Sequence, residues 1–308
     1  MPDTTLETLP SLKSLTTSEW FEQAGEIVED RGDIERLGGK HIALRREGSS
    51  TLLVTFETLQ GIEMLSPQAH PLGWHFADAH GWSQLTMISD GDTWFRDETL
   101  YAYFDRMVDD GYFDGFEHVM FYGAGPCGYA AAAFSVVAPG ARVLVLQPQA
   151  TLDAGIAGWD ARFTEKRRLN FTDRYGYAPD MLEAANRAYI VFDPDEREDA
   201  MHAALFTRPN VTRLALRHMG SAIQTDLLRM EILNELIEAA ARGRLSPARF
   251  ARLARARRDH LPYLRRLLSK LELEGRTGLI RLLCRNVNAR MRAPRFAKRL
   301  KLLDNPDP

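Results

Sequence analysis

The sequence has little cysteine and no long apolar run. Its two cysteines, Cys127 and Cys284, are too few for a disulfide framework or a cysteine-based zinc site. No apolar stretch reaches the roughly 18 residues that a membrane span needs, and the N-terminus lacks the pattern of a secretory signal. We therefore expect a cytoplasmic protein. A hydrophobic content of 45% and a charged content of 26% exclude a disordered chain.

The near-neutral formal charge of -3 hides a strong asymmetry. From residue 241 onward there are 19 Lys and Arg against 5 Asp and Glu, which leaves 20 basic and 37 acidic residues before it. This split predicts an acidic body with a basic appendage that binds an acidic protein or a membrane surface, or else packs on the body and neutralises it. Nucleic acid ranks lower as a partner, because few aromatic side chains for stacking bases lie among the basic residues.

The apolar pattern predicts alternating strands and helices up to about residue 235. The expected strands are 41–46, 51–57, 84–89, 118–122, 142–147, 188–193 and 211–216. The expected helices are 16–30, 98–110, 126–137, 179–187 and 195–206. This alternation is typical of an α/β fold with a mostly parallel sheet and helices on both faces. We expect the first two strands to form an antiparallel hairpin.

The remaining sequence contains no further strand pattern. It predicts three or four short amphipathic helices. We therefore divide the chain into an α/β domain, 1–235, and an all-α basic tail, 236–308.

A glycine-rich turn between a strand and an alanine-rich helix is the most informative segment. Gly123, Gly125 and Gly128 form the spacing G-x-G-x-x-G, which predicts a dinucleotide site for FAD or NAD in one interpretation. The following strand ends in Gln147 instead of the acidic residue expected to bind a ribose. In the other interpretation, the turn is the nucleophile elbow of an α/β-hydrolase.

The second interpretation is supported by several separated motifs. The turn 123–131 resembles the elbow G-x-S-M-G-G-[YF]-x-A of small bacterial α/β-hydrolase-like proteins, and 89–97 resembles a loop of the same family. Further matches are the Pro148-Gln149 pair and the motif Asp160, Arg162, Phe163. The resemblance covers about residues 50 to 235 and implies a three-layer α/β-hydrolase-like sandwich.

The match departs from the family where catalysis would occur. Gly125 stands at the nucleophile position, and Pro126 after it has no N–H for an oxyanion hole. Ala222 matches the family's histidine, and His218 is a poor substitute. The candidates for the triad acid are Asp193, Asp195 and Asp199, of which the first two are also candidate helix caps.

Two enzymatic alternatives remain open beside the loss of triad chemistry. Cys127 is a candidate nucleophile in a shifted register, with the Gly128 N–H as oxyanion donor. The chain as a whole also resembles bacterial proteins named phosphoadenosine phosphosulfate reductases, although it lacks the S-G-G-x-D-[ST] loop and the Glu-Cys-Gly segment of that enzyme.

We expect a small-molecule pocket at the elbow, without triad hydrolysis and without a cofactor. Its predicted rim is Gly123 to Gly128 together with Asp90 and Arg96. His70, His75 and His80 match no metal-binding signature, and we predict no metal site.

Overall fold

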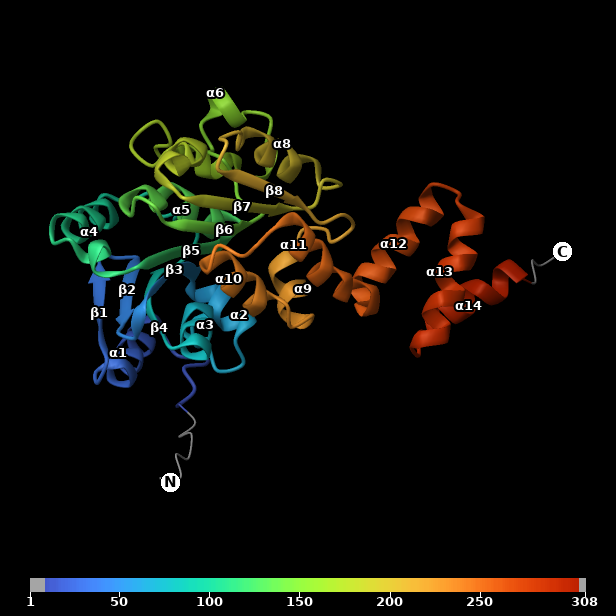
Figure 1. The fold of residues 1–308 in the computed structure, drawn as a ribbon, viewed down its shortest axis with the longest axis horizontal. Coiled ribbons are helices and arrows are strands. Elements are labelled where there is room, and N and C mark those ends of the chain that lie inside the picture. The colour runs from blue at the N-terminus through green and yellow to red at the C-terminus, as the bar shows by residue number, and fades with distance from the viewer. Residues whose placement is uncertain (1–8, 305–308) are drawn as a thin grey trace.

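One eight-stranded sheet forms the centre of the protein in a computed structural model that describes residues 9–304 (Figure 1). The strands are β1 (Gly32–Leu37), β2 (His41–Arg46), β3 (Ser49–Thr58), β4 (Trp82–Ser89), β5 (His118–Ala124), β6 (Arg142–Leu146), β7 (Arg187–Phe192) and β8 (Val211–Ala215). Their order is β1-β2-β4-β3-β5-β6-β7-β8, and β2 alone runs antiparallel to its neighbours. The predicted α/β fold class, with its helical C-terminal region, is confirmed.

The expected hairpin between the first two predicted strands is wrong. β2 and β3 are not paired, because β4 lies between them. The hairpin partner of β2 is β1, a strand that the apolar pattern did not predict. β1 reads GDIERL and forms one edge of the sheet, where mostly polar and partly exposed residues leave no apolar run to detect.

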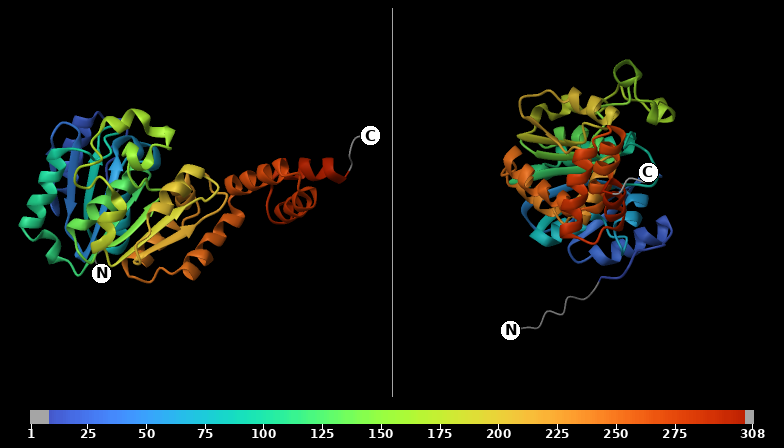
Figure 2. Two further views of the ribbon diagram at one scale, coloured as in Figure 1. Left: turned by 90° about the horizontal axis from the view of Figure 1, so that it is seen from above. Right: turned by 90° about the vertical axis from the view of Figure 1, so that its right-hand side faces the viewer.

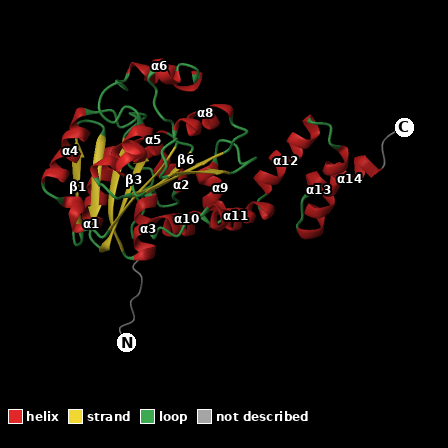
Figure 3. Cartoon of the chain, turned by 45° about the horizontal axis from the view of Figure 1, so that its top comes forward, coloured by secondary structure: helices red, strands yellow, loops and turns green. Residues whose placement is uncertain are grey.

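The helices cover both faces of the sheet (Figure 3). They are α1 (Thr17–Val28), α2 (Leu59–Leu65), α3 (Leu72–His80), α4 (Glu98–Asp109), α5 (Pro126–Phe134), α6 (Ala154–Ala157), α7 (Ala178–Met181), α8 (Arg197–Leu205), α9 (Ile223–Arg229), α10 (Leu233–Ala241), α11 (Pro247–Leu253), α12 (Leu261–Leu273), α13 (Thr277–Arg290) and α14 (Pro294–Asp304). The capping box predicted at Thr16 and Glu19 begins α1. The expected helix 179–187 is instead α7 followed by a short 3-10 turn and the start of β7.

Two large apolar cores lie on the opposite faces of the sheet. Helices α4, α5 and α7 pack into one core, and α3, α9 and α10 pack into the other. The run Ala130 to Ala133 is fully buried, because small side chains let α5 lie close to the sheet. The second core continues through α11 and α12 into α13 and α14, so the C-terminal helices are packed elements.

The separation of the C-terminal helices from the sheet begins later than the predicted boundary. Residue 235 lies inside α10, and α10 contacts β5 and β6. Figure 2 shows α12, α13 and α14 extending away from the sheet. We call these three helices, residues 261–304, the appendage.

Polar contacts fasten the first appendage helix to the body. Asp226 on α9 is buried and binds both His260, which precedes α12, and Arg266. In the last turn of α12, Lys270 donates to Asp195 at 3.0 Å. The basic tail is thus paired with the acidic body at its root.

Candidate functional site

The turn between β5 and α5 has the sharp geometry of an elbow. Gly125 stands at its tip with φ +55° and ψ -128°, a conformation that glycine adopts freely and that strains a residue with a Cβ. A Cβ on Gly123 would lie 2.2 Å from the carbonyl oxygen of Cys127, so the close approach of strand and helix requires glycine there too. Gly123 and Gly128 are buried beneath the turn.

The space at the tip of the turn is open. A Cβ built on Gly125 meets no atom within 4 Å among the described residues, so neither Cys127, His202 nor His218 fills it. The N–H of Gly125 donates to the carbonyl of Leu146 at 2.8 Å. Pro126 has no N–H to offer at the first position of α5.

A cavity of about 640 Å³ lies over this turn. Gly125, Pro126 and Cys127 form part of its floor, and the loop that contains Ala222 forms part of its wall. The apolar lining comprises Phe56, Met64, Leu65, Leu72, Tyr122 and Phe163. The polar lining includes Glu57, Gln60, Asp92, Gln147, Gln149, Arg162, Asp199, Ser221, Gln224 and Thr225. The cavity is therefore apolar along much of its wall, with a small number of placed polar groups, as in small-molecule sites generally.

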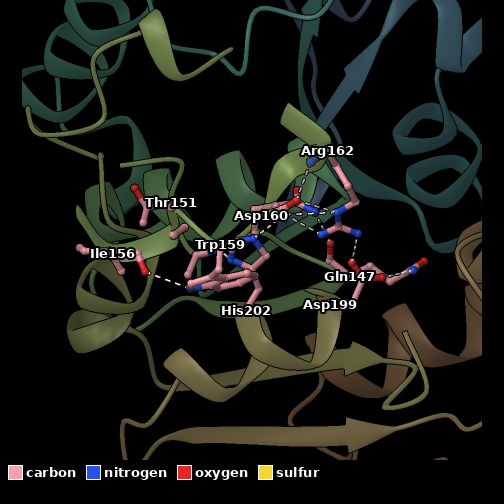
Figure 4. A network of polar contacts seen from close by, with 12 residues as sticks. Gln147, Thr151, Ile156, Trp159, Asp160, Arg162, Asp199 and His202 are labelled. Carbon is pink, nitrogen blue, oxygen red and sulfur yellow. Dashed lines mark hydrogen bonds and ion pairs between the residues drawn. The ribbon is translucent and has the colours of Figure 1, made fainter. Parts of the chain in front are cut away.

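An arginine clamped between two acids forms one polar wall of the cavity (Figure 4). Arg162 donates through Nε and Nη2 to Asp160 and through Nη1 to Asp199 at 2.7 Å. Gln147 donates to the other oxygen of Asp199 at 2.6 Å. These contacts use three of the five N–H groups of Arg162, and its side chain is 36% exposed, so two N–H groups remain without a partner among the described residues.

His202 extends this network into the protein interior. Its Nδ1 accepts from the backbone N–H of Ala150, so its Nε2 carries the proton and donates to Asp160 at 3.0 Å. Burial lowers the pKa of His202 and favours its neutral form. Burial opposes ionisation of Asp160 too, but hydrogen bonds from Arg162 and His202 outweigh it and hold the pKa of Asp160 at about 2.

The environment of Cys127 is unsuitable for a thiolate. The residue is half-buried, and burial raises the pKa of its thiol, with a further contribution from Glu57 and Asp92. Burial raises the pKa of Glu57 also, although this carboxyl accepts the N–H groups of Leu72 and Gly73. The N-terminus of α3 thus stabilises the carboxylate of Glu57. Among the described residues, no cation stabilises a thiolate at Cys127.

Two of the candidate acids after β7 bind backbone N–H groups or a side chain of the appendage. Asp193 is buried and accepts the N–H groups of Asp195 and Gly220. Asp195 binds His218 and Lys270. The predicted capping of α8 by these two aspartates is wrong, because that helix begins after Glu196 with no side-chain cap.

Asp90 and Arg96 are not at the cavity rim, contrary to the prediction. Asp90 accepts from Thr17 at 2.9 Å, and Arg96 donates to the carbonyls of Asn170 and Arg174. The neighbouring residues Gly91 and Asp92 line the cavity instead. The prediction placed the loop correctly and its side chains incorrectly, because local turn geometry decides which residues face inward.

The three histidines of the 70–80 segment bind three different partners. His70 contacts the carbonyl of Pro10, His75 lies 3.5 Å from Ser66, and His80 binds Asn234. No group of three potential metal ligands occurs in the part of the chain that the structure describes. Trp74, inside this segment, and Trp94, beyond it, are core residues.

Binding of FAD or NAD at the turn stays a prediction. Gln147, at the position expected to be acidic, binds Asp199 and accepts the N–H of Ile223. At the polar wall, the carboxylates of Asp160 and Asp199 share the single guanidinium of Arg162, while Asp92 across the cavity pairs with Lys166 at 3.3 Å. This charge distribution is unfavourable for a pyrophosphate.

The sequence does not show that residues distant along the chain meet at this wall. Asp160 and Arg162 stand out in it only as part of a family resemblance, and Asp199 only as a candidate triad acid. Asp160 lies two residues before Arg162, and this spacing was the one sign in the sequence of a local ion pair. Nothing local in the sequence connects this pair to Asp199 and His202 on α8.

Comparison with known proteins yields similarity of fold only. No protein-family model matches the chain, and no curated protein matches it. Among solved structures, Est1E from Butyrivibrio proteoclasticus overlaps with a TM-score of 0.45 at 11% identity, covering 68% of this chain and 98% of that one. The capsule O-acetyltransferase of Neisseria meningitidis serogroup A gives a TM-score of 0.43 at 12% identity, covering 66% and 94%. The chain has an α/β-hydrolase-like fold, and no helix in residues 9–304 is long and apolar enough to cross a membrane.

Proposed function

We propose that this protein binds a neutral small molecule in the cavity over the elbow and does not hydrolyse it by serine chemistry. The observation that carries the proposal is Gly125 at the tip of the elbow, with open space above it and Pro126 behind it. A nucleophile and one oxyanion donor are both missing from the turn that supplies them in α/β-hydrolases. The cavity itself is retained at a volume suited to a small ligand.

The charges of the lining support a neutral ligand with an oxygen acceptor. The two N–H groups of Arg162 without a partner can donate to a carbonyl oxygen, while Asp160 and Asp199 already balance the charge of the guanidinium. An anion would be repelled by the second carboxylate of this cluster, because Asp160 and Asp199 share one guanidinium. The apolar part of the ligand would contact Leu65, Leu72 and Met64, the last of which is 82% exposed.

A fluorophosphonate probe tests the absence of serine chemistry. We expect no labelling of the folded protein under conditions that label a known serine esterase. Ser221 is the serine that lines the cavity, so any labelling should be compared with the Ser221→Ala variant. Labelling that disappears in this variant would overturn the proposal.

Titration calorimetry with three probes of equal chain length tests the ligand class. We expect decanamide to bind at least about fivefold more tightly than decanoate, since one unit-charge contact at about 4 Å costs about 1 kcal/mol even in water. Decylammonium tests whether the carboxyl groups prefer a cation. Ala222→Trp should block binding, whereas Ala204→Trp, on an exposed part of α8 outside the cavity, should not. Tighter binding of either ion than of the amide contradicts the proposal.

A further inference from the structure

The appendage exposes an unusual combination of leucines and cations. Residues 261–304 contain 12 Lys and Arg against 3 Asp and Glu. Four leucines in the same segment are solvent-exposed, Leu273 at 90%, Leu282 at 64%, Leu279 at 49% and Leu302 at 47%. We call these four residues the exposed leucines. Exposed leucines occur singly on many surfaces, but several close together mark an interaction site.

Three of the exposed leucines lie on adjoining segments of α13 and α14. Leu279 and Leu282 are one turn apart on α13. Arg281 between them donates to the carbonyl of Leu303 and to Asp304, each at 3.0 Å. This contact brings the last turn of α14, with Leu302, beside the first half of α13.

Several cations on the same segments have no acidic partner or only a distant one. Lys298 and Lys301 are exposed, one turn apart on α14, and have no ion pair among residues 9–304. Arg285 is exposed and lies 3.9 Å from Asp304. The pairs that hold the appendage to the body involve α12 and its start, together with Arg290 at the end of α13, which binds Asp259. Lys298 and Lys301 on α14 take no part in them.

We propose that α13 and α14 dock on the surface of a membrane that contains anionic lipid. Basic side chains bind the anionic headgroups, and the exposed leucines enter the apolar boundary beneath them, as in helices that lie at a bilayer interface. The basic side chains favour a membrane with anionic headgroups over one whose lipids are electrically neutral. Nucleic acid is disfavoured because Tyr263 and Phe296, the aromatic residues of the appendage, are buried and cannot stack on bases. The projection of these helices away from the sheet lets them reach a flat surface (Figure 2).

Sedimentation of the full chain with lipid vesicles tests the proposal. We expect binding to vesicles of phosphatidylcholine with phosphatidylglycerol and much weaker binding to phosphatidylcholine alone. Lys298→Ala and Lys301→Ala should each weaken binding about fivefold, since each basic residue near an anionic surface contributes about a factor of five. Leu282→Asp should weaken binding at least about tenfold, because it places a charge in the apolar boundary.

Controls on the body separate this effect from general surface changes. Lys40→Ala, in the turn between β1 and β2, and Val108→Asp, on the exposed side of α4, should leave vesicle binding unchanged. Circular dichroism should show Leu282→Asp to be folded, and the lysine variants give an independent reading if it is not. Absence of binding to anionic vesicles would overturn the proposal. So would a dimer in solution that Leu282→Asp dissociates, because a second copy would then cover the leucines.

Discussion

Two buried aspartates in this protein each bind one arginine and one histidine, but they join different parts of the chain. Asp160 binds Arg162 and His202 beside the cavity. Asp226 binds Arg266 and His260 at the root of the appendage. Because both carboxylates are buried and have lost their hydration, each is stable only while its arginine and histidine bind it.

The difference lies in which segments are joined. The Asp160 cluster joins a loop after β6 to α8, both within the α/β body, and one side of its arginine faces the cavity. The Asp226 cluster joins α9 of the body to α12 of the appendage. One cluster therefore supports the site, and the other sets the position of the basic helices.

The largest effect is expected from Asp160→Ala. It leaves Arg162 with one acid and removes the partner of His202 in a buried setting, which should lower the free energy of unfolding by about 3–5 kcal/mol. Urea denaturation measures this. Asp153→Ala, which removes only the cap of α6, should cost about 1 kcal/mol and serves as the control. If both variants lost the same free energy of unfolding, the Asp160 cluster would not stabilise the α/β body.

Asp226→Ala should have a somewhat smaller and more local effect. The side chain of Arg266 is 34% exposed and can turn to water, so we expect a loss of about 2–3 kcal/mol. Hydrogen exchange should become faster in α12 and remain slow in α5. Uniformly faster exchange would contradict the distinction between the two clusters.

Acid should weaken the Asp160 cluster in two stages. Because burial lowers the pKa of His202, the unfolded chain binds a proton below about pH 6.5 that the folded protein does not, and stability falls as the pH decreases from there. Asp160, with its pKa of about 2, contributes stability above about pH 4 that is lost between about pH 4 and pH 2, at most about 2 kcal/mol. His202→Gln should reduce the first stage and leave the second unchanged, as thermal unfolding against pH would show. The rest of the first stage comes from His41 and His75, whose pKa values burial also lowers.

The sequence predicted those features that depend on local pattern. Seven of the strands, the capping box at Thr16 and the glycines of the turn follow from apolar runs, cap chemistry and backbone geometry. The strand order did not follow, because the edge strand β1 lacks an apolar signature and β4 inserts between β2 and β3. Both aspartate clusters were also beyond reach, since Asp160 and His202 are separated by 42 residues and Asp226 and His260 by 34.

The smallest effect is expected from Lys270→Ala, which removes a contact between α12 and Asp195. Both side chains are partly exposed, so the pair should contribute no more than about 1 kcal/mol to stability, and less at high salt. Asp195 keeps His218 as a second partner, which reduces the loss further. Since α12 also buries Leu264 and Leu268, apolar packing and the Asp226 cluster should be enough to hold the appendage. A loss above about 2 kcal/mol, measured by urea denaturation against the Lys40→Ala control, would instead mean that surface charge fixes the appendage on the body, and the contrast between a buried anchor and a peripheral ion pair would not hold.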